Sequence, residues 1–93
     1  MGLETIGLLI SNGLKPDLVV DKINEYRYEM YLDSSKIVSN DSNIEDQPCW
    51  RIAKIEVETV GDDTCYRTLF PGGSMRYDFI ASEAKNYTYN YAK

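Results

Sequence analysis

Apolar and polar residues alternate most clearly between residues 50 and 60. Trp50 and Ile52 share one parity, whereas Ala53 and Ile55 share the other. Because alternate side chains of a strand point to opposite faces, this change of phase predicts a β-bulge near residues 52 and 53 or burial of both faces at the start of the strand. We predict a central strand over residues 50–60, with Trp50 and Ile52 in the core.

The residues after this strand are typical of a hairpin. Residues 61–63, Gly-Asp-Asp, predict a turn, after which residues 64–70 return as an antiparallel partner. The Pro-Gly-Gly sequence at residues 71–73 ends that partner strand. Residues 77–80 and 87–91 are two further predicted strands.

Residues 18–33 fit two periodicities. Apolar residues at spacings of three and four fit a helix, and apolar residues at a spacing of two fit a strand. The aromatic and β-branched content favours a strand over residues 25–32, and residues 18–25 stay open between helix and strand. The helical set is Val19, Ile23, Tyr26 and Met30, and the alternating set is Tyr26, Tyr28, Met30 and Leu32.

Residues 3–12 are predicted to form a short helix, with an edge strand through residues 8–10 as the alternative. Apolar residues recur at helical spacing, and the Asn-Gly-Leu sequence at residues 12–14, followed by Pro16, is typical of a helix stop. A helix this short is not stable alone in water, so we predict that residues 1–16 dock on another surface. The apolar positions of this helix include Leu3, Ile6 and Ile10.

Together these elements predict one mainly β domain over residues 1–93, a small antiparallel β-sandwich or barrel with a possible short N-terminal helix. Its β core covers residues 50–91. A polar loop is expected over residues 34–48, and at about 15 residues it is long enough to suggest function or disorder. With 93 residues there is room for a single modest core.

The charge is distributed unevenly along the chain, and this distribution argues against nucleic acid as a partner. Residues 1–49 hold four Lys/Arg and nine Asp/Glu, whereas residues 50–93 hold six of each, which accounts for the net charge of -5. An acidic half without a basic cluster is a poor surface for nucleic acid. The sequence has neither an apolar run of about 20 residues nor a signal peptide, so we expect no membrane partner and synthesis in the cytoplasm.

The sequence offers little catalytic chemistry. It contains no histidine, which excludes Ser-His and Cys-His nucleophile pairs and every zinc site that uses histidine. The acidic residues considered for carboxylate catalysis lie in the predicted turn (Asp62 and Asp63) or in the polar loop (Asp41, Glu45 and Asp46), where solvated side chains are the better interpretation. The stretch 41–46 resembles a calcium loop but lacks its glycine at the sixth position. We therefore predict no enzyme, no cofactor and no metal site.

The two cysteines are expected to stay apart. Cys49 precedes the central strand, and the predicted hairpin sets Cys65 opposite about Thr59. Ten residues of strand then separate the two thiols by about 33 Å, far beyond disulfide reach. We predict two free thiols.

Three of the eight tyrosines recur at a spacing of two, and a strand over residues 87–91 would present them on one face. Packing in the core and contact with a partner are both open for them, because tyrosine is common at protein interfaces. The predicted interface set is Tyr87, Tyr89 and Tyr91 together with Leu3, Ile6 and Ile10. We expect these residues to face neighbouring subunits, with the acidic loop 34–48 toward solvent.

Three sequence motifs follow one another in the second half of the chain. They are Trp50-Arg51-Ile52-Ala53-Lys54-Ile55, then Gly73-Ser74-Met75-Arg76-Tyr77-Asp78, then Glu83 and Thr88-Tyr89. In these motifs the chain resembles small virion proteins of tailed bacteriophages, which have the pattern Trp-x-Ile-x-Lys/Arg-Ile, Gly-Asn-x-x-Phe/Tyr-Asp, Trp-Asp-Asp/Asn-Arg and a closing Thr-Tyr. It departs from them at Ala81, where they have a second tryptophan, and at Ala84, where they have an arginine.

The resemblance implies a non-enzymatic structural component of a phage virion, in the tail, the neck or as a capsid accessory protein. It implies a small β-sandwich or barrel present in many copies, with other virion proteins and copies of itself as partners. Such a protein is made in the cytoplasm of the host bacterium and resides in the virion. The alternative is a free-standing binding module or inhibitor that acts on a host protein through the loop 34–48 or the tyrosine face.

Overall fold

The computed structural model describes residues 15–39 and 43–93. The strands are β1 (Leu18–Lys22), β2 (Tyr26–Leu32), β3 (Pro48–Val60), β4 (Asp63–Pro71), β5 (Phe79–Ile80) and β6 (Tyr89–Asn90). Within these two ranges, three short 3-10 helices connect them: η2 (Ser34–Lys36), η3 (Ile44–Asp46) and η4 (Ala81–Asn86). The predicted N-terminal helix over residues 3–12, with Leu3, Ile6 and Ile10, lies outside the described residues.

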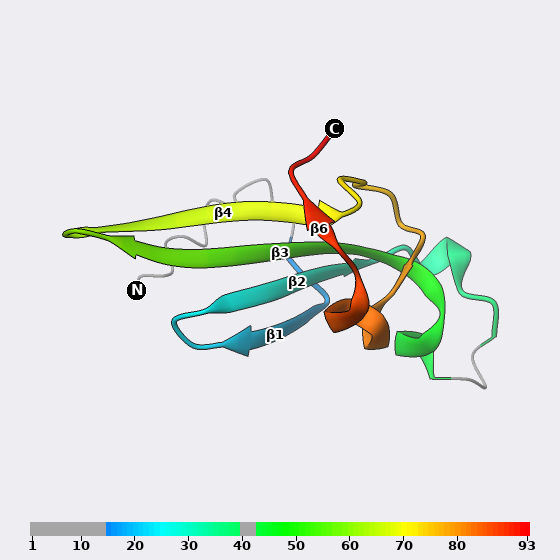
Figure 1. The fold of residues 1–93 in the computed structure, drawn as a ribbon. Helices are drawn as coiled ribbons and strands as arrows, with labels where there is room; N and C mark the ends of the chain where they lie inside the picture. The colour runs from blue at the N-terminus through cyan, green and yellow to red at the C-terminus, as the bar shows by residue number, and fades with distance from the viewer. Residues whose placement is uncertain (1–14, 40–42) are drawn as a thin grey trace.

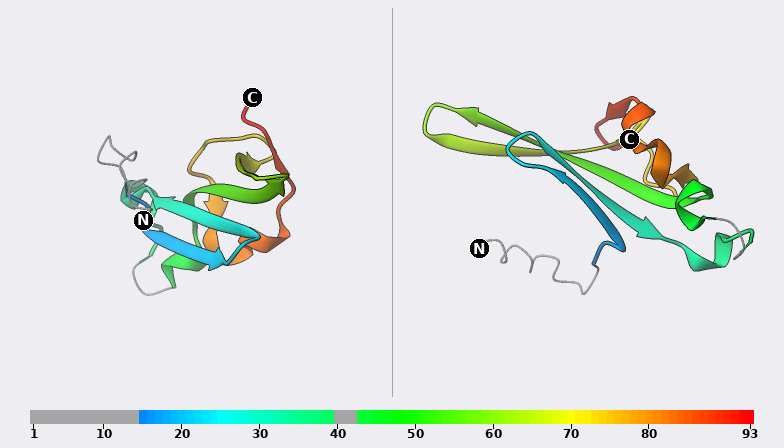
Figure 2. Two further views of the ribbon diagram at one scale, coloured as in Figure 1. Left: turned by 90° about the vertical axis from the view of Figure 1, so that its left-hand side faces the viewer. Right: turned by 90° about the horizontal axis from the view of Figure 1, so that it is seen from below.

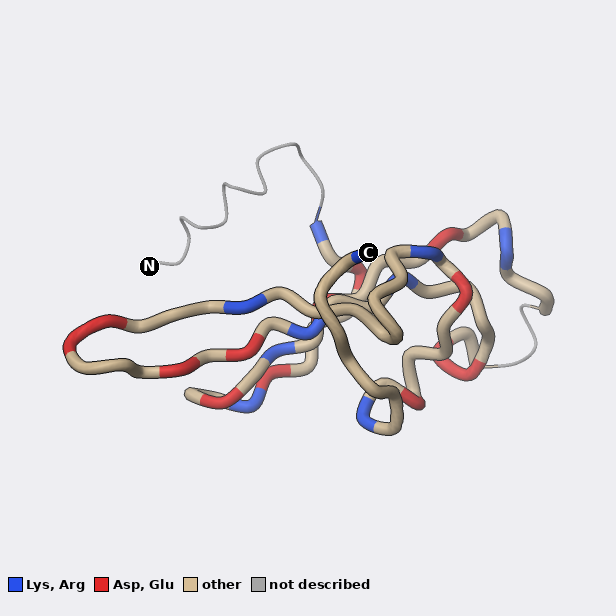
Figure 3. Tube along the Cα trace, turned by 45° about the horizontal axis from the view of Figure 1, so that its top comes forward, with Lys and Arg blue, Asp and Glu red and all other residues tan. Residues whose placement is uncertain are grey.

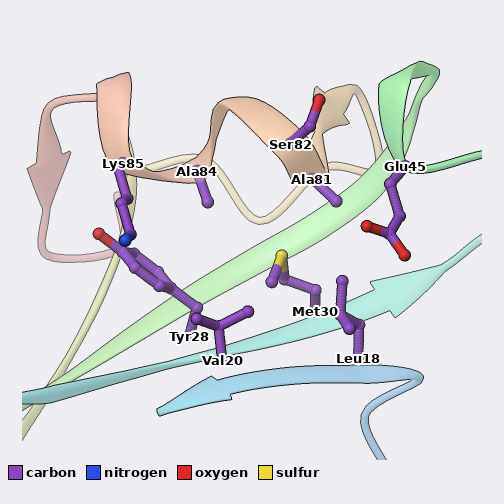
Figure 4. A pocket seen from close by; sticks show the side chains of 9 residues that line it. All are labelled: Leu18, Val20, Tyr28, Met30, Glu45, Ala81, Ser82, Ala84 and Lys85. Carbon is purple, nitrogen blue, oxygen red and sulfur yellow. The ribbon is translucent and has the colours of Figure 1, made fainter. Parts of the chain in front are cut away.

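The strands form one antiparallel sheet in the order β1-β2-β3-β4-β6, with β5 paired to the start of β3 (Figure 1). The prediction of a mainly β, antiparallel fold is therefore confirmed. Within the described residues, the layer that covers the core face of the sheet is built from η4 and short connecting segments rather than from a second sheet (Figure 4).

Residues 18–32 fold as a β-hairpin, so the strand alternative for this segment is confirmed. The register pairs Lys22 with Tyr26, and the Glu25 N–H donates to the Lys22 carbonyl oxygen at 3.0 Å. Asn24 closes this turn with a φ of 67°, a left-handed conformation that asparagine tolerates better than most residues. Ile23, which belonged to the helical set, is left 78% exposed at the turn.

Both faces of the sheet are buried at the start of β3. Trp50 and Ile52 lie on the face that carries the main core and are 4% and 0% exposed, which confirms the core prediction for both. Ala53, on the opposite face, is 5% exposed. The pairing of β3 with β2 runs without a shift, and the irregularity lies between Pro48 and Trp50, where β5 joins. The phase change in the sequence therefore reflects burial on two sides, not a bulge at residues 52 and 53.

The core lies between β2, β3 and η4. Met30 from β2 packs against Trp50 and Ile52 of β3, and η4 covers them with Ala81 and Ala84 (Figure 4). These two alanines are the positions at which the sequence departs from the phage pattern. Their short side chains are buried where η4 approaches the sheet.

The predicted loop over residues 34–48 contains η2 and η3, and Pro48 already belongs to β3. The side chain of Gln47 is buried, and its Oε1 accepts the Val38 N–H at 2.6 Å. The Trp50 Nε1–H donates to the Ile44 carbonyl oxygen at 3.0 Å and fastens η3 to the core. The described part of this loop is thus attached to the domain by specific hydrogen bonds.

The remaining strand boundaries differ from prediction in length. The strand expected over residues 64–70 is β4, which is one residue longer at each end. The strands expected over residues 77–80 and 87–91 are present only as the two-residue strands β5 and β6.

The two cysteines are free, as predicted. Cys65 pairs with Glu58, one residue from the predicted partner, because the turn contains only two unpaired residues. Cys49 lies nine residues before Glu58 in the same strand, so about 30 Å still separates it from Cys65.

Candidate interaction surfaces

The β3–β4 hairpin extends well past the rest of the sheet (Figures 1 and 2). Pairing between β2 and β3 stops at Tyr26 and Glu56, whereas β3 and β4 stay paired out to Val60 and Asp63. The molecule measures 48 × 27 × 24 Å along its principal axes, and the hairpin supplies much of that elongation. We call residues 57–68 the arm.

The arm has no core of its own. Tyr66 is 69% exposed and Val60 is 54% exposed. Its turn contains Gly61 at a φ of 62°, a conformation that suits glycine. Beyond the strand ladder, an ion pair between Arg67 and Glu58 joins its two strands. The Val57 N–H at its base also donates to the Glu25 carbonyl oxygen at 3.0 Å. An element held by backbone hydrogen bonds and one surface ion pair gains little stability from its side chains, so packing among the described residues does not explain its length.

The charges of the arm gather at its tip. Glu58, Asp62 and Asp63 lie at or near the turn, and Arg67 is the basic residue that follows on β4 (Figure 3). The arm therefore presents an acidic end and a single basic position further back. A partner that matches it in charge must offer the reverse order.

One edge of β4 is open. Strand β6 pairs with β4 only at Phe70 and Pro71, so from Asp63 to Leu69 the outer side of β4 meets no strand of the described residues. Soluble proteins commonly protect such edges with lysine, proline or a bulge. Residues 63–69, Asp-Thr-Cys-Tyr-Arg-Thr-Leu, contain neither lysine nor proline, and their ladder to β3 has no register shift. This edge is chemically suited to pair with another strand.

A second surface feature is an open groove of about 300 Å³ between η4 and the β1–β2 hairpin (Figure 4). Leu18, Val20 and Met30 form its apolar side, and Glu45 and Lys85 stand at its two ends. Two-carboxylate hydrolysis requires a pair of acids, and the groove has the one carboxylate of Glu45. Its chemistry suits contact with an apolar group rather than catalysis.

The structure separates the three tyrosines of the predicted interface. Tyr87 and Tyr89 are partly buried against the core, whereas Tyr91 is 63% exposed. The Tyr89 hydroxyl donates to the Ala84 carbonyl oxygen at 2.7 Å, and the Tyr87 hydroxyl accepts the Ile80 N–H at 3.0 Å. Burial raises the pKa of Tyr89 above the usual tyrosine value. Of the predicted face, only Tyr91 is largely open to a partner.

The open edge was not predicted as a site. Thr64, Tyr66 and Thr68 alternate as exposed residues on one face of β4, without the apolar set that marks a strand with one buried face. That missing set was the available signal that this part of the hairpin extends past the core.

The ion pairs of the described residues include one carboxylate with two cationic partners. The Asp78 carboxylate accepts hydrogen bonds from Lys36 at 2.8 Å and Arg76 at 2.7 Å, which hold its pKa below the usual aspartate value. Among residues 15–39 and 43–93, no three His, Cys, Asp or Glu side chains gather in a way that could hold a metal ion. None of the helices in these ranges has the length and hydrophobicity needed to cross a membrane.

The chain matches no protein-family model, no curated protein and no solved structure. A functional interpretation must therefore start from the arm, the open edge of β4, the groove and the sequence motifs.

Proposed function

We propose that this chain is a non-enzymatic structural component of a tailed-bacteriophage virion, in the tail, the neck or as a capsid accessory protein. It acts through contacts with other virion proteins and with copies of itself. The observation that carries this proposal is the arm, an extended hairpin with an open strand edge that contributes little to the core of its own domain.

An unprotected strand edge exposes backbone N–H and C=O groups that pair readily with another chain. In a free monomer such an edge promotes aggregation, whereas in a subunit of a larger particle it is covered. The length of the arm lets it reach a neighbour while the core stays intact. These properties favour a protein that functions in an assembly over one that functions alone.

Two features of the sequence add support. The resemblance to small phage virion proteins runs from Trp50 to Tyr89 and includes the first half of β3, which forms the core. The lack of histidine removes the commonest general base and many nucleophile systems, which favours a structural role over catalysis. The net charge of -5 favours protein partners over nucleic acid.

The test is the composition of purified particles. Phage particles are prepared from bacteria that carry the gene in its natural phage or prophage, and each protein is counted by quantitative mass spectrometry. We expect this chain at a fixed number of copies relative to the major structural proteins. A non-structural protein encoded by the same phage serves as the control and should be lost on purification.

Absence of the chain from the particles would overturn the proposal. If it is instead recovered in a stoichiometric complex with a host protein, the alternative of a free-standing binding module or inhibitor is correct. A virion component is recovered in the particles, whereas a binding module or inhibitor is recovered with its host protein in the lysate.

A further inference from the structure

The backbone groups at the open edge of β4 can be identified from the neighbouring hydrogen bonds. The Gly72 N–H donates to the Thr88 carbonyl oxygen at 2.8 Å, so residue 72 directs its backbone groups toward the β6 side. These directions alternate along a strand. Thr64, Tyr66 and Thr68 therefore direct their N–H and C=O groups to the open edge, whereas Cys65 and its odd-numbered neighbours direct theirs to β3.

The side chains of β4 are arranged so that the strand complements itself. Asp63, Cys65 and Arg67 share one face, with the acid and the base equally far from the cysteine. If a second β4 runs antiparallel beside the first, about a two-fold axis at Cys65, Asp63 of each chain lies opposite Arg67 of the other. Opposite charges in directly opposed positions stabilise a strand pair. On the other face, Thr64 lies opposite Tyr66 twice.

Neighbouring registers lack this match. The second strand can shift only by steps that keep even-numbered residues opposite even-numbered residues, because the even-numbered residues carry the backbone N–H and C=O groups at the open edge. An axis at Arg67 sets two guanidinium groups directly opposite each other, which is destabilising. An axis at Tyr66 sets Arg67 opposite Cys65 and leaves Asp63 opposite Leu69, so both charge pairs are lost. The register about Cys65 is thus favoured by charge.

We propose that the arm forms a symmetric pair with a second copy of this chain through the open edge of β4, with the two-fold axis at Cys65. The two arms then point in opposite directions, and the tip of each lies beside the base of the other. This inference rests on the proposed function and identifies its contact between like subunits. Each Thr64–Tyr66 pair contributes two backbone hydrogen bonds.

The same register makes a specific chemical prediction. Cys65 of the two chains would form a pair without backbone hydrogen bonds between them, in which the Cα atoms are about 4.5 Å apart. This separation falls within the range of about 4.4–6.8 Å that a disulfide spans. Cys65 is part-exposed, so an oxidant reaches it, whereas Cys49 is buried. Mild oxidation can therefore report the register.

The first experiment measures association and crosslinking of the purified full chain. Sedimentation should show a reversible monomer–dimer equilibrium, and copper-phenanthroline oxidation should give a dimer linked through Cys65, as peptide mapping can verify. Cys65→Ser should abolish the crosslink and keep the dimer. A dimer that does not crosslink, or that crosslinks at another residue, would overturn the proposed register.

The second experiment tests the edge with matched variants at one position. Tyr66→Pro removes an N–H that faces the open edge and leaves the bonds to β3 in place, so the domain should fold but no longer dimerise. Tyr66→Thr keeps that N–H and should weaken the dimer much less. Circular dichroism establishes that both variants fold. Dimerisation that survives in a folded Tyr66→Pro variant would contradict the proposal.

The third experiment exchanges the charges. Asp63→Arg and Arg67→Asp should each weaken the dimer about tenfold, because each creates two like-charge pairs between the chains. Arg67→Asp also removes the ion pair with Glu58 within the arm, so circular dichroism must first establish that this variant folds. The double variant, or an equimolar mixture of the two single variants, restores opposite charges and should recover most of the affinity. Failure to recover would overturn the register. A chain that is monomeric in solution at all concentrations but stoichiometric in particles would refute this inference and leave the proposed function standing.

Discussion

The two halves of β3 are used in opposite ways within one continuous strand. From Cys49 to Ala53 it is buried on both faces, whereas from Glu58 to Val60 it is exposed as part of the arm. Both halves pair with β4 or β2 through regular backbone ladders. Regular pairing is therefore common to both, and side-chain burial is what separates the stable body from the exposed arm.

This difference concentrates side-chain burial, and the stability that comes with it, in the body. Met30 and Ile52 are almost completely buried, and truncating such residues typically costs about 2–5 kcal/mol. An isolated two-stranded hairpin is at best marginally stable in water. The arm persists because its ladder continues from the body, so its exposed side chains are not needed to hold it in place.

The largest contrast between the two regions is expected from paired truncations. Trp50→Ala removes a side chain that is 4% exposed and leaves the Ile44 carbonyl without its donor, so the free energy of unfolding should fall by about 3–5 kcal/mol. Tyr66→Ala in the arm should change it by less than about 0.5 kcal/mol. Urea denaturation of dilute protein measures both. Similar losses in the two variants would show that the arm is part of the cooperative core.

Thiol reactivity should separate the regions without mutation. Cys65 in the arm is part-exposed, whereas Cys49 in the body is 0% exposed, and burial raises the pKa of its thiol. Cys49 must await an opening of the core, which should slow its reaction about a thousandfold, equivalent to about 4 kcal/mol. Native and denatured Ellman assays measure this ratio. Two thiols reacting at one rate would refute the buried placement of Cys49.

The tyrosines of the body should make it sensitive to alkali. Burial raises the pKa of Tyr89, so the folded state holds its phenol proton more tightly than the unfolded chain. Stability from this group is complete below the ordinary tyrosine pKa of about 10 and is lost as the pH rises toward the higher folded value. Tyr89→Phe should lose about 1 kcal/mol at neutral pH with the hydrogen bond to Ala84, and then decline less steeply above pH 10.

Denaturation curves at neutral pH and at about pH 11 measure this effect. Tyr66→Phe is the matched control, because the exposed Tyr66 hydroxyl lies in the arm. An equally steep alkaline decline in Tyr89→Phe and in the control would show that Tyr89 does not contribute to it.

The hairpin of β3 and β4 could be predicted because its signals are local. A two-residue turn with glycine lies between alternating strands, and Trp50 and Ile52 mark the buried face. The strands β5 and β6 could not be predicted to their true length. Each is two residues long and exists where β3 or β4 supplies a partner, which depends on contacts distant in sequence.

The tyrosines near the C-terminus illustrate the same limit. A spacing of two predicted one shared face, yet Tyr87 precedes β6 and bonds to Ile80, whereas Tyr89 bonds to Ala84. Ile80 belongs to β5 and Ala84 to η4, and the positions of both elements follow from packing against the core that contains Met30 and Trp50. Periodicity alone cannot distinguish a face that meets the chain's own core from one that meets a partner.

The residue order alone was enough to establish a β-rich chain, a hairpin about residues 61–63, a core at Trp50 and Ile52 and two separate thiols. These features depend on side-chain alternation and on turn chemistry, which act between near neighbours. Folding decided which strand edges are covered. Within residues 15–39 and 43–93, strand β6 meets β4 at Phe70 and Pro71 alone and no strand pairs with the edge beside Tyr66, because an edge is closed by whichever distant segment packs beside it.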